Sequence, residues 1–211
     1  RRKLYLTEYP NVGSARSKPA ARQDFIADWS AGQLIVHYIG HGSPTQLADE
    51  VLFRIEDVSA LRNATKRSLF LGFSCDVAIF DDPTVQSMSE ALVLSAAGGA
   101  IATIAATYVT YVGPNEVLTD AFYGRIYPGA PGSLVPRTTL GRSAPVGIAL
   151  FEAKTIGLVP GFPPQAFQRK NDAKYVILGD PGIRLQSPEE DVVLDGPLAQ
   201  RIRTGQLERL N

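Results

Sequence analysis

Three short segments of the chain are apolar throughout, and helical patterns lie between them. They cover residues 34–39 (LIVHYI), 68–73 (SLFLGF) and 100–107 (AIATIAAT). A strand that is apolar at every position is buried on both faces, and such strands occur in parallel sheets that helices cover on each side. The sequence therefore predicts a three-layer α/β fold with a mainly parallel central sheet flanked by helices.

The remaining segments predict the helices around this sheet and three further strands. Helices are predicted over residues 20–29, 56–63, 87–97, 114–126 and 138–156, and additional strands over residues 3–9, 174–178 and 183–185. Ser87 and Glu90 stand in capping-box spacing at the start of one helix, and Gly98 and Gly99 follow its expected end.

Composition excludes several classes of protein. Lys and Arg number 21 and so do Asp and Glu, so the formal net charge is zero, and no nucleic-acid partner is expected. The longest apolar run, residues 96–109, is shorter than the roughly 20 residues that a membrane span needs. A single cysteine excludes an internal disulfide and a cysteine-rich zinc site.

The chain begins Arg1-Arg2-Lys3 rather than with Met, so we expect it to be a piece of a longer protein. Residues 1–186 are predicted to form one domain. The strand and helix patterns thin after Ser187, and residues 187–211 are interpreted as a linker into a following, β-rich domain.

The single cysteine and one of the two histidines follow consecutive predicted strands. His41, between Gly40 and Gly42, comes after the first strand, and Cys75 comes after the second. Ligands bind at the carboxyl ends of the strands in such a sheet, and consecutive strands usually lie side by side, roughly 4.8 Å apart. We therefore expect the thiol and the imidazole to lie within reach of each other.

This pair of side chains suggests acyl transfer from a peptide. A thiolate is a nucleophile, and a nearby imidazole can accept a proton or protonate the leaving group. The backbone N–H groups of Gly42 and Cys75 are candidates for an oxyanion hole. The alternative is that Cys75 is a small buried apolar residue and His41 a loop residue. His37 lies inside its strand and is interpreted as structural.

Three residues that leave the third strand at the same edge are candidates for binding substrate: Thr107, Tyr108 and Tyr111. Packing is the equally weighted alternative for them. Ser43 and Ser74 raise the possibility of a serine hydrolase, but the G-x-S-x-G motif is absent.

Acidic residues near the two strand ends have mainly structural interpretations. Asp49 or Glu50 can orient His41, but solvated loop carboxylates are the favoured interpretation. Asp81 and Asp82 can bind Ca²⁺ through oxygen ligands or cap local structure, and the structural role is favoured. No metal site is predicted.

The sequence resembles the clan CD cysteine peptidases, which have the caspase-like fold, and within them the gingipain family. The resemblance rests on YIGHGS (38–43), LFLGFSC (69–75), FDD (80–82), SMSEALVLSAAGGAIATIAAT (87–107) and ILGDPGIRL (177–185). It covers residues 3–185, nearly the whole chain.

The resemblance implies a cysteine endopeptidase that acts on protein or peptide substrates without a cofactor. Cys75 would be the nucleophile, His41 the general acid and base, and Gly42 with the Cys75 N–H the oxyanion hole. Family members are exported bacterial proteins of the cell surface or the extracellular space. They include the signal peptidase of type IX secretion, a sortase-like enzyme, which stays an alternative. A non-catalytic caspase-like scaffold or binding module is the alternative from another class.

Two departures from these families limit what the resemblance implies. The segment GFSCDVAIFDD lacks the QAC-x-G signature of caspases, so a preference for cleavage after Asp does not transfer. Nothing before Lys3 matches the N-terminal α/β subdomain of gingipain-like catalytic domains. We therefore expect part of the substrate pocket to lie outside this chain.

Overall fold

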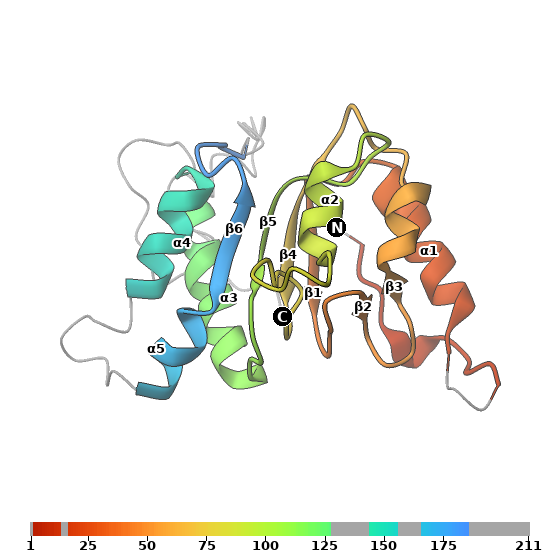
Figure 1. Ribbon diagram of the computed structural model, residues 1–211, viewed down its shortest axis with the longest axis horizontal. Coiled ribbons are helices and arrows are strands. Elements are labelled where there is room, and N and C mark those ends of the chain that lie inside the picture. The colour runs from red at the N-terminus through yellow and green to blue at the C-terminus, as the bar shows by residue number, and fades with distance from the viewer. Residues whose placement is uncertain (1, 14–16, 128–143, 156–165, 186–211) are drawn as a thin grey trace, which may run out of the picture.

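A four-stranded sheet forms the centre of the computed structural model, which describes residues 2–13, 17–127, 144–155 and 166–185 (Figure 1). In spatial order its strands are β1 (Ile35–Ile39), β4 (Ser68–Phe73), β5 (Ala100–Ala106) and β6 (Tyr175–Gly179). The first three strands are parallel, and β6 runs antiparallel to β5. The predicted α/β fold with a mainly parallel sheet is confirmed.

Helices cover both faces of the sheet and make two separate apolar cores (Figure 1). One face packs against α1 (Pro19–Ser30) and α2 (Met88–Leu94), and the other against α3 (Val112–Ile126) and α4 (Val146–Thr155). Alternate residues of β4 point to opposite cores: Phe70 to the first, Leu69 and Leu71 to the second. This double burial explains why β4 and β5 are apolar at nearly every position, whereas β1, at the end of the strand order, keeps His37 and Ile39 exposed.

An aromatic cluster fills the first core. Trp29 stacks on Phe70 with ring centroids 5.3 Å apart, and its other neighbours are Phe25 and Phe53. Trp29, Phe53 and Phe70 are almost completely inaccessible to solvent. These rings join α1 to the middle of the sheet.

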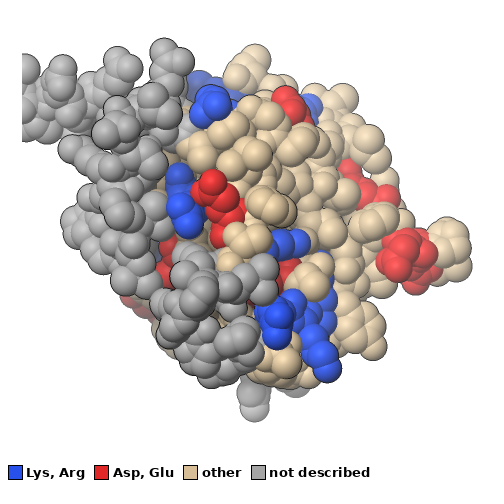
Figure 2. Space-filling model, turned by 90° about the vertical axis from the view of Figure 1, so that its left-hand side faces the viewer, with Lys and Arg blue, Asp and Glu red and all other residues tan. Residues whose placement is uncertain are grey.

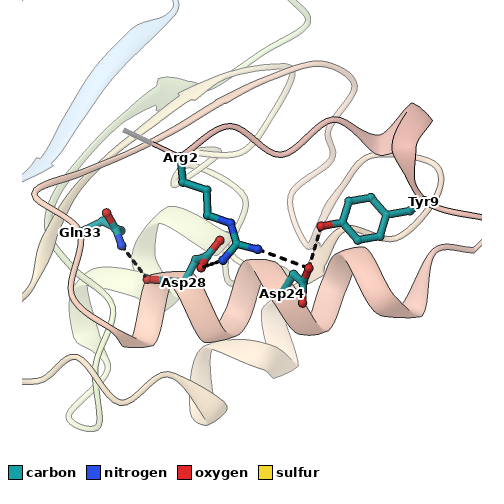
Figure 3. A network of polar contacts seen from close by, with 5 residues as sticks. All are labelled: Arg2, Tyr9, Asp24, Asp28 and Gln33. Carbon is teal, nitrogen blue, oxygen red and sulfur yellow. Dashed lines mark hydrogen bonds and ion pairs between the residues drawn. The ribbon is translucent and has the colours of Figure 1, made fainter.

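The predicted N-terminal strand over residues 3–9 is wrong, because this segment packs along α1 instead of pairing with a strand. It contains the 3₁₀ helix η1 (Leu6–Glu8), and its apolar residues Leu4, Leu6 and Tyr9 contact the first core. The Tyr9 hydroxyl donates to the Asp24 carboxylate, and Arg2 pairs with Asp24 and Asp28 on the same helix (Figure 3). The alternating pattern therefore reflects one side packed on a helix.

Other predicted elements differ at their ends or in type. Residues 56–63 contain the 3₁₀ helix η2 (Ile55–Ala60) rather than an α-helix, and α2 ends at Leu94 rather than at residue 97. The capping box of Ser87 and Glu90 is confirmed. The predicted strand at residues 183–185 is wrong, because the Ile183 carbonyl accepts from the N–H of Val146 at the start of α4.

Three elements were not predicted: β2 (Gln46–Leu47), β3 (Phe53–Arg54), which pairs with it, and α5 (Ala166–Asp172). Of the predicted helix at 138–156, the structure describes residues 144–155. The predicted linker at 187–211 lies outside the described residues.

Gly99 turns the chain into β5 in a conformation that requires glycine. Its φ is +116°, and a Cβ there would lie 2.3 Å from the Leu92 carbonyl oxygen. The buried Asn63 side chain holds the turn, since it accepts from the Gly99 N–H at 2.7 Å and donates to the Gly99 carbonyl at 2.9 Å. The turn sets where β5 enters the sheet.

The surface carries charges of both signs. On the face beside α4 and α5, Lys and Arg side chains are interspersed with Asp and Glu (Figure 2). Within the described residues, no helix is both long enough and apolar enough to span a membrane.

Candidate active site

The two candidate catalytic residues follow neighbouring strands directly. β1 and β4 pair in register up to Ile39 and Phe73, and the next residues are also joined, since the Ser74 hydroxyl donates to the Gly40 carbonyl at 2.8 Å. His41 and Cys75 are the residues that follow this bonded pair. Both therefore leave the sheet at the same edge, from adjacent strands.

The backbone of His41 is held while its side chain is exposed. Its carbonyl accepts from the Tyr38 hydroxyl at 2.6 Å and from the Ala48 N–H at 2.9 Å. Among the residues that the structure describes, no side chain hydrogen-bonds to the imidazole, and this includes Asp49 and Glu50. The ring is thus free to turn toward a substrate.

Gly42 lies closely against the segment that carries Cys75. A Cβ at Gly42 would lie 2.3 Å from the Ser74 hydroxyl oxygen and 3.1 Å from Val77 Cγ2, so no larger residue fits without a shift. Gly42 also forms an antiparallel bridge with Leu47, with hydrogen bonds on either side of the bridge rather than at Gly42 itself. Within the described parts of the chain, the N–H groups of Gly42 and Cys75 have no acceptor. Both remain available to a ligand.

Cys75 is half-buried, and its sulfur contacts Thr110 in the loop between β5 and α3. The Thr110 N–H donates to the sulfur at 3.3 Å, and the thiol can donate to the Thr110 carbonyl at 3.6 Å. The next residue, Asp76, has a φ of +58°, in the left-handed region that non-glycine residues rarely occupy. Burial raises the pKa of Asp76, while Lys174 acts in the opposite direction. Strained backbone of this kind clusters at functional sites.

The three residues predicted to bind substrate have different surroundings. Tyr108 and Tyr111 are 63% and 49% exposed, and the Lys174 ammonium lies 5.7 and 5.5 Å from their ring centroids. Tyr111 also contacts Phe167 of α5, with centroids 4.9 Å apart. Thr107 is half-buried, and its N–H and its hydroxyl both donate to the Lys174 carbonyl. The two tyrosine rings form an exposed aromatic surface near Cys75.

The other residues considered from the sequence have structural partners. His37 lies inside β1 and contacts the rings of Phe73 and Tyr123. The Ser74 hydroxyl is buried and donates to Gly40, so it is not placed as a nucleophile. Asp82 accepts from the N–H and hydroxyl of Thr84, and these bonds lower its pKa. In the described part of the chain, no three His, Cys, Asp or Glu side chains gather as metal ligands.

Sequence reasoning missed a buried polar group behind the cysteine. It comprises Thr110, Asn115, Asn171 and Tyr175, each less than 10% exposed. Asn115 lies in the first turn of α3, and Asn171 near the end of α5, where polar residues are usually exposed. No periodicity in the sequence distinguishes a buried asparagine at such a position from a solvated one.

The sheet, its helices and the residues at its carboxyl edge define a caspase-like α/β protein. The chain belongs to the gingipains, peptidase family C25, a family of cysteine peptidases, because the sequence profile of that family matches residues 1–186. A comparison with curated proteins finds no match.

Solved structures with the same fold include gingipains. One is the crystal structure of the Arg-specific cysteine proteinase gingipain R, with 20% identity and a TM-score of 0.61 over 78% of this chain. Another is the complex of the pro- and mature domains of Porphyromonas gingivalis RgpB, with 18% identity and a TM-score of 0.59 over 78% of this chain. The chain spans little more than a third of these structures, 36% and 37%.

The contribution of Asp172 to the free energy of unfolding is expected to fall as the pH rises from about 4 to 6. Burial raises the pKa of this carboxyl to about 6, although Gln168 donates to it and Lys154 lies near. Since that pKa exceeds the roughly 3.9 of an unfolded chain, the folded state binds more protons between the two values. Ionisation of the Asp172 carboxyl therefore lowers the free energy of unfolding. This loss is absent well below pH 4 and complete well above pH 6.

Asp172→Asn is expected to remove this contribution, so that the variant gains stability relative to the wild type as the pH rises. Urea unfolding midpoints of both proteins at pH 4 and pH 7 measure the effect. Asp120→Asn, on an exposed position of α3, is the control and is expected to show no such trend. Equal differences between wild type and Asp172→Asn at the two pH values would contradict the assignment.

Proposed function

We propose that this protein is a cysteine endopeptidase that cleaves peptide bonds through a Cys75–His41 dyad. The observation that carries the proposal is the hydrogen bond between Ser74 and Gly40, because it joins the two strands at the point from which both side chains leave the sheet. Family membership supports the reaction class, since the family consists of cysteine peptidases.

The reaction proceeds through an acyl-enzyme. The thiol proton passes to the His41 imidazole, and the sulfur attacks the peptide carbonyl carbon. The imidazolium then protonates the departing amine as the C–N bond breaks, which leaves a thioester on Cys75. Water attacks the thioester, the C–S bond breaks, and the acid product leaves. None of these steps requires a metal or an organic cofactor.

The N–H groups of Gly42 and Cys75 are proposed to stabilise the oxyanion. Neither has an acceptor among the described residues, and Gly42 packs directly against Ser74, the neighbour of Cys75. An N–H group that is already in place loses no energy to reorganisation when the negative charge develops on the substrate oxygen.

Thr107, Tyr108 and Tyr111 are proposed to bind a substrate side chain, the two tyrosines through their exposed rings. The substrate is a protein or a peptide. We also propose that the protein is exported by a bacterium and acts at the cell surface or outside the cell, as is typical of the family.

A panel of peptidyl electrophiles with Arg, Lys, Asp or a small residue at the cleavage position tests the dyad, with mass mapping of the product. We expect one peptide to label Cys75, and His41→Ala to abolish that labelling. If no peptidyl reagent reacts but iodoacetamide does, the endopeptidase proposal fails for this chain as it stands. If neither reacts, a non-catalytic scaffold or binding module is the better interpretation.

The same panel also tests the alternative of a type IX secretion signal peptidase or sortase. An acyl-enzyme that an added amine captures in preference to water would favour the transpeptidase. Release of the free acid alone would favour the endopeptidase.

A further inference from the structure

Three polar groups of Thr110 lie close to the sulfur of Cys75. Besides its N–H at 3.3 Å and its carbonyl at 3.6 Å, its hydroxyl oxygen lies 4.0 Å from the sulfur, and either atom of that pair can be the donor. Thr110 is 7% exposed, so water does not compete freely for these contacts. Whether the Thr110 hydroxyl donates to the sulfur or accepts from it depends on which atom the hydroxyl hydrogen faces.

The neighbouring side chains determine the orientation of the Asn115 amide. Asn115 Oδ1 accepts from the Tyr175 hydroxyl at 2.7 Å and from Asn171 Nδ2 at 2.9 Å. Two donors on this oxygen require that the amide nitrogen faces the other side, where Nδ2 donates to the Thr110 hydroxyl oxygen at 3.1 Å. Burial raises the pKa of Tyr175, so its phenol stays protonated and remains a donor.

The Thr110 hydroxyl therefore accepts from Asn115 and keeps its own hydrogen for another acceptor. Two acceptors lie near this hydroxyl: the sulfur of Cys75 and the phenol oxygen of Tyr175. A hydrogen bond from Thr110 to the phenol oxygen lowers the pKa of Tyr175. When the thiol ionises, the sulfur becomes the more strongly charged of the two. A hydrogen bond to an ionised acceptor is stronger than one to a neutral oxygen, so the hydroxyl turns to the sulfur.

The same polar group also fixes the loop that carries the Thr110 N–H. Asn171 Oδ1 accepts from the Tyr111 N–H at 3.0 Å, one residue after Thr110. On the other side, the Thr107 N–H donates to the Lys174 carbonyl at 2.9 Å. The loop is thus held on both sides of Thr110, and its N–H stays directed at the sulfur.

We propose that Thr110 is a positioning residue that stabilises the thiolate of Cys75, and that Asn115, Asn171 and Tyr175 hold it in place. The donors run in one direction, from the Tyr175 phenol through the Asn115 amide and the Thr110 hydroxyl to the sulfur. Hydrogen bonds to the charged form of a group favour that form, so this series of hydrogen bonds raises the fraction of Cys75 that is present as the reactive thiolate. The role in catalysis rests on the proposed endopeptidase function, but the effect on the thiol does not.

The rate of alkylation by iodoacetamide as a function of pH tests the proposal. Cys75 is the single cysteine, so no other thiol contributes. Thr110→Val removes the hydroxyl and keeps the N–H, and we expect the midpoint of the pH profile to rise by about 0.5–1 unit. Thr110→Ser is expected to restore the wild-type midpoint, and Tyr175→Phe to raise it by a smaller amount.

Thr103→Val is the matched control. Thr103 is also a fully buried threonine, inside β5, but its hydroxyl oxygen has no hydrogen-bond partner among the described residues. The same substitution there is expected to leave the midpoint unchanged. The titratable groups of the neighbouring segments, His41, Asp76, Asp172, Lys174 and Tyr175, are present in both valine variants, so a difference between the variants reports the Thr110 hydroxyl.

An unchanged midpoint in a folded Thr110→Val variant would overturn the proposal, and so would an equal shift in Thr103→Val. Circular dichroism establishes folding in each case. Because iodoacetamide needs no peptide site, this result is independent of whether the peptidyl electrophiles react.

Discussion

His41→Ala is expected to lower kcat/KM for the peptide selected by the electrophile panel about 10²–10⁴-fold, the usual contribution of a general acid and base. The amine leaving group cannot depart without a proton, and the exposed imidazole is the group that follows β1 at the same edge as Cys75. Steady-state hydrolysis measures the loss. At a pH high enough to ionise the thiol without His41, the iodoacetamide rate is expected to change far less, since the thiolate then needs no proton acceptor and alkylation needs no leaving-group proton.

His37→Ala is the matched control for this experiment. It removes the other histidine of the chain, which lies inside β1 and packs against Phe73 and Tyr123. Its kcat/KM is expected to stay within a few-fold of the wild type. A loss of less than 10-fold in His41→Ala, or an equal loss in both variants, would contradict the proposed role of His41.

Phe70→Ala is expected to lower the free energy of unfolding by about 3–5 kcal/mol. Phe70 is inaccessible to solvent in β4 and stacks on Trp29, so the substitution leaves a cavity between α1 and the sheet. The neighbouring rings cannot close this cavity without leaving their own contacts. Denaturant unfolding monitored by fluorescence of Trp29, the single tryptophan, measures the loss.

Phe151→Ala removes the same side chain from an exposed position of α4 and is the matched control. Its free energy of unfolding is expected to stay within about 0.5 kcal/mol of the wild type. If Phe70→Ala loses no more than Phe151→Ala, the first core is not packed as described.

Burial of β4 and β5 on both faces made the centre of the sheet predictable. The segments that form β1, β4 and β5 are apolar at nearly every position, and a segment of that kind has few other places in a folded chain. Residues 3–9 were misassigned for a related reason. Alternation of apolar and polar residues indicates one buried side, and Leu4, Leu6 and Tyr9 reach that state on α1 without any strand partner.

Some residues of the candidate site could be predicted from the local sequence pattern, and others could not. His41, Gly42 and Cys75 could be named in advance, because residues directly after consecutive parallel strands emerge at one edge whatever the rest of the fold does. Family membership is readable from the sequence in the same way, since it resides in local motifs around these positions.

Thr110 and its three buried partners could not be identified before the structure was known. Asn115, Asn171 and Tyr175 come from three elements, α3, α5 and β6, whose meeting point depends on how the helices pack and on β6 running antiparallel to β5. Local sequence encodes which residues are apolar and where strands end, because both follow from short-range pattern. Contacts between distant segments determine which polar side chains are buried together. They also determine which of these side chains lies against the sulfur.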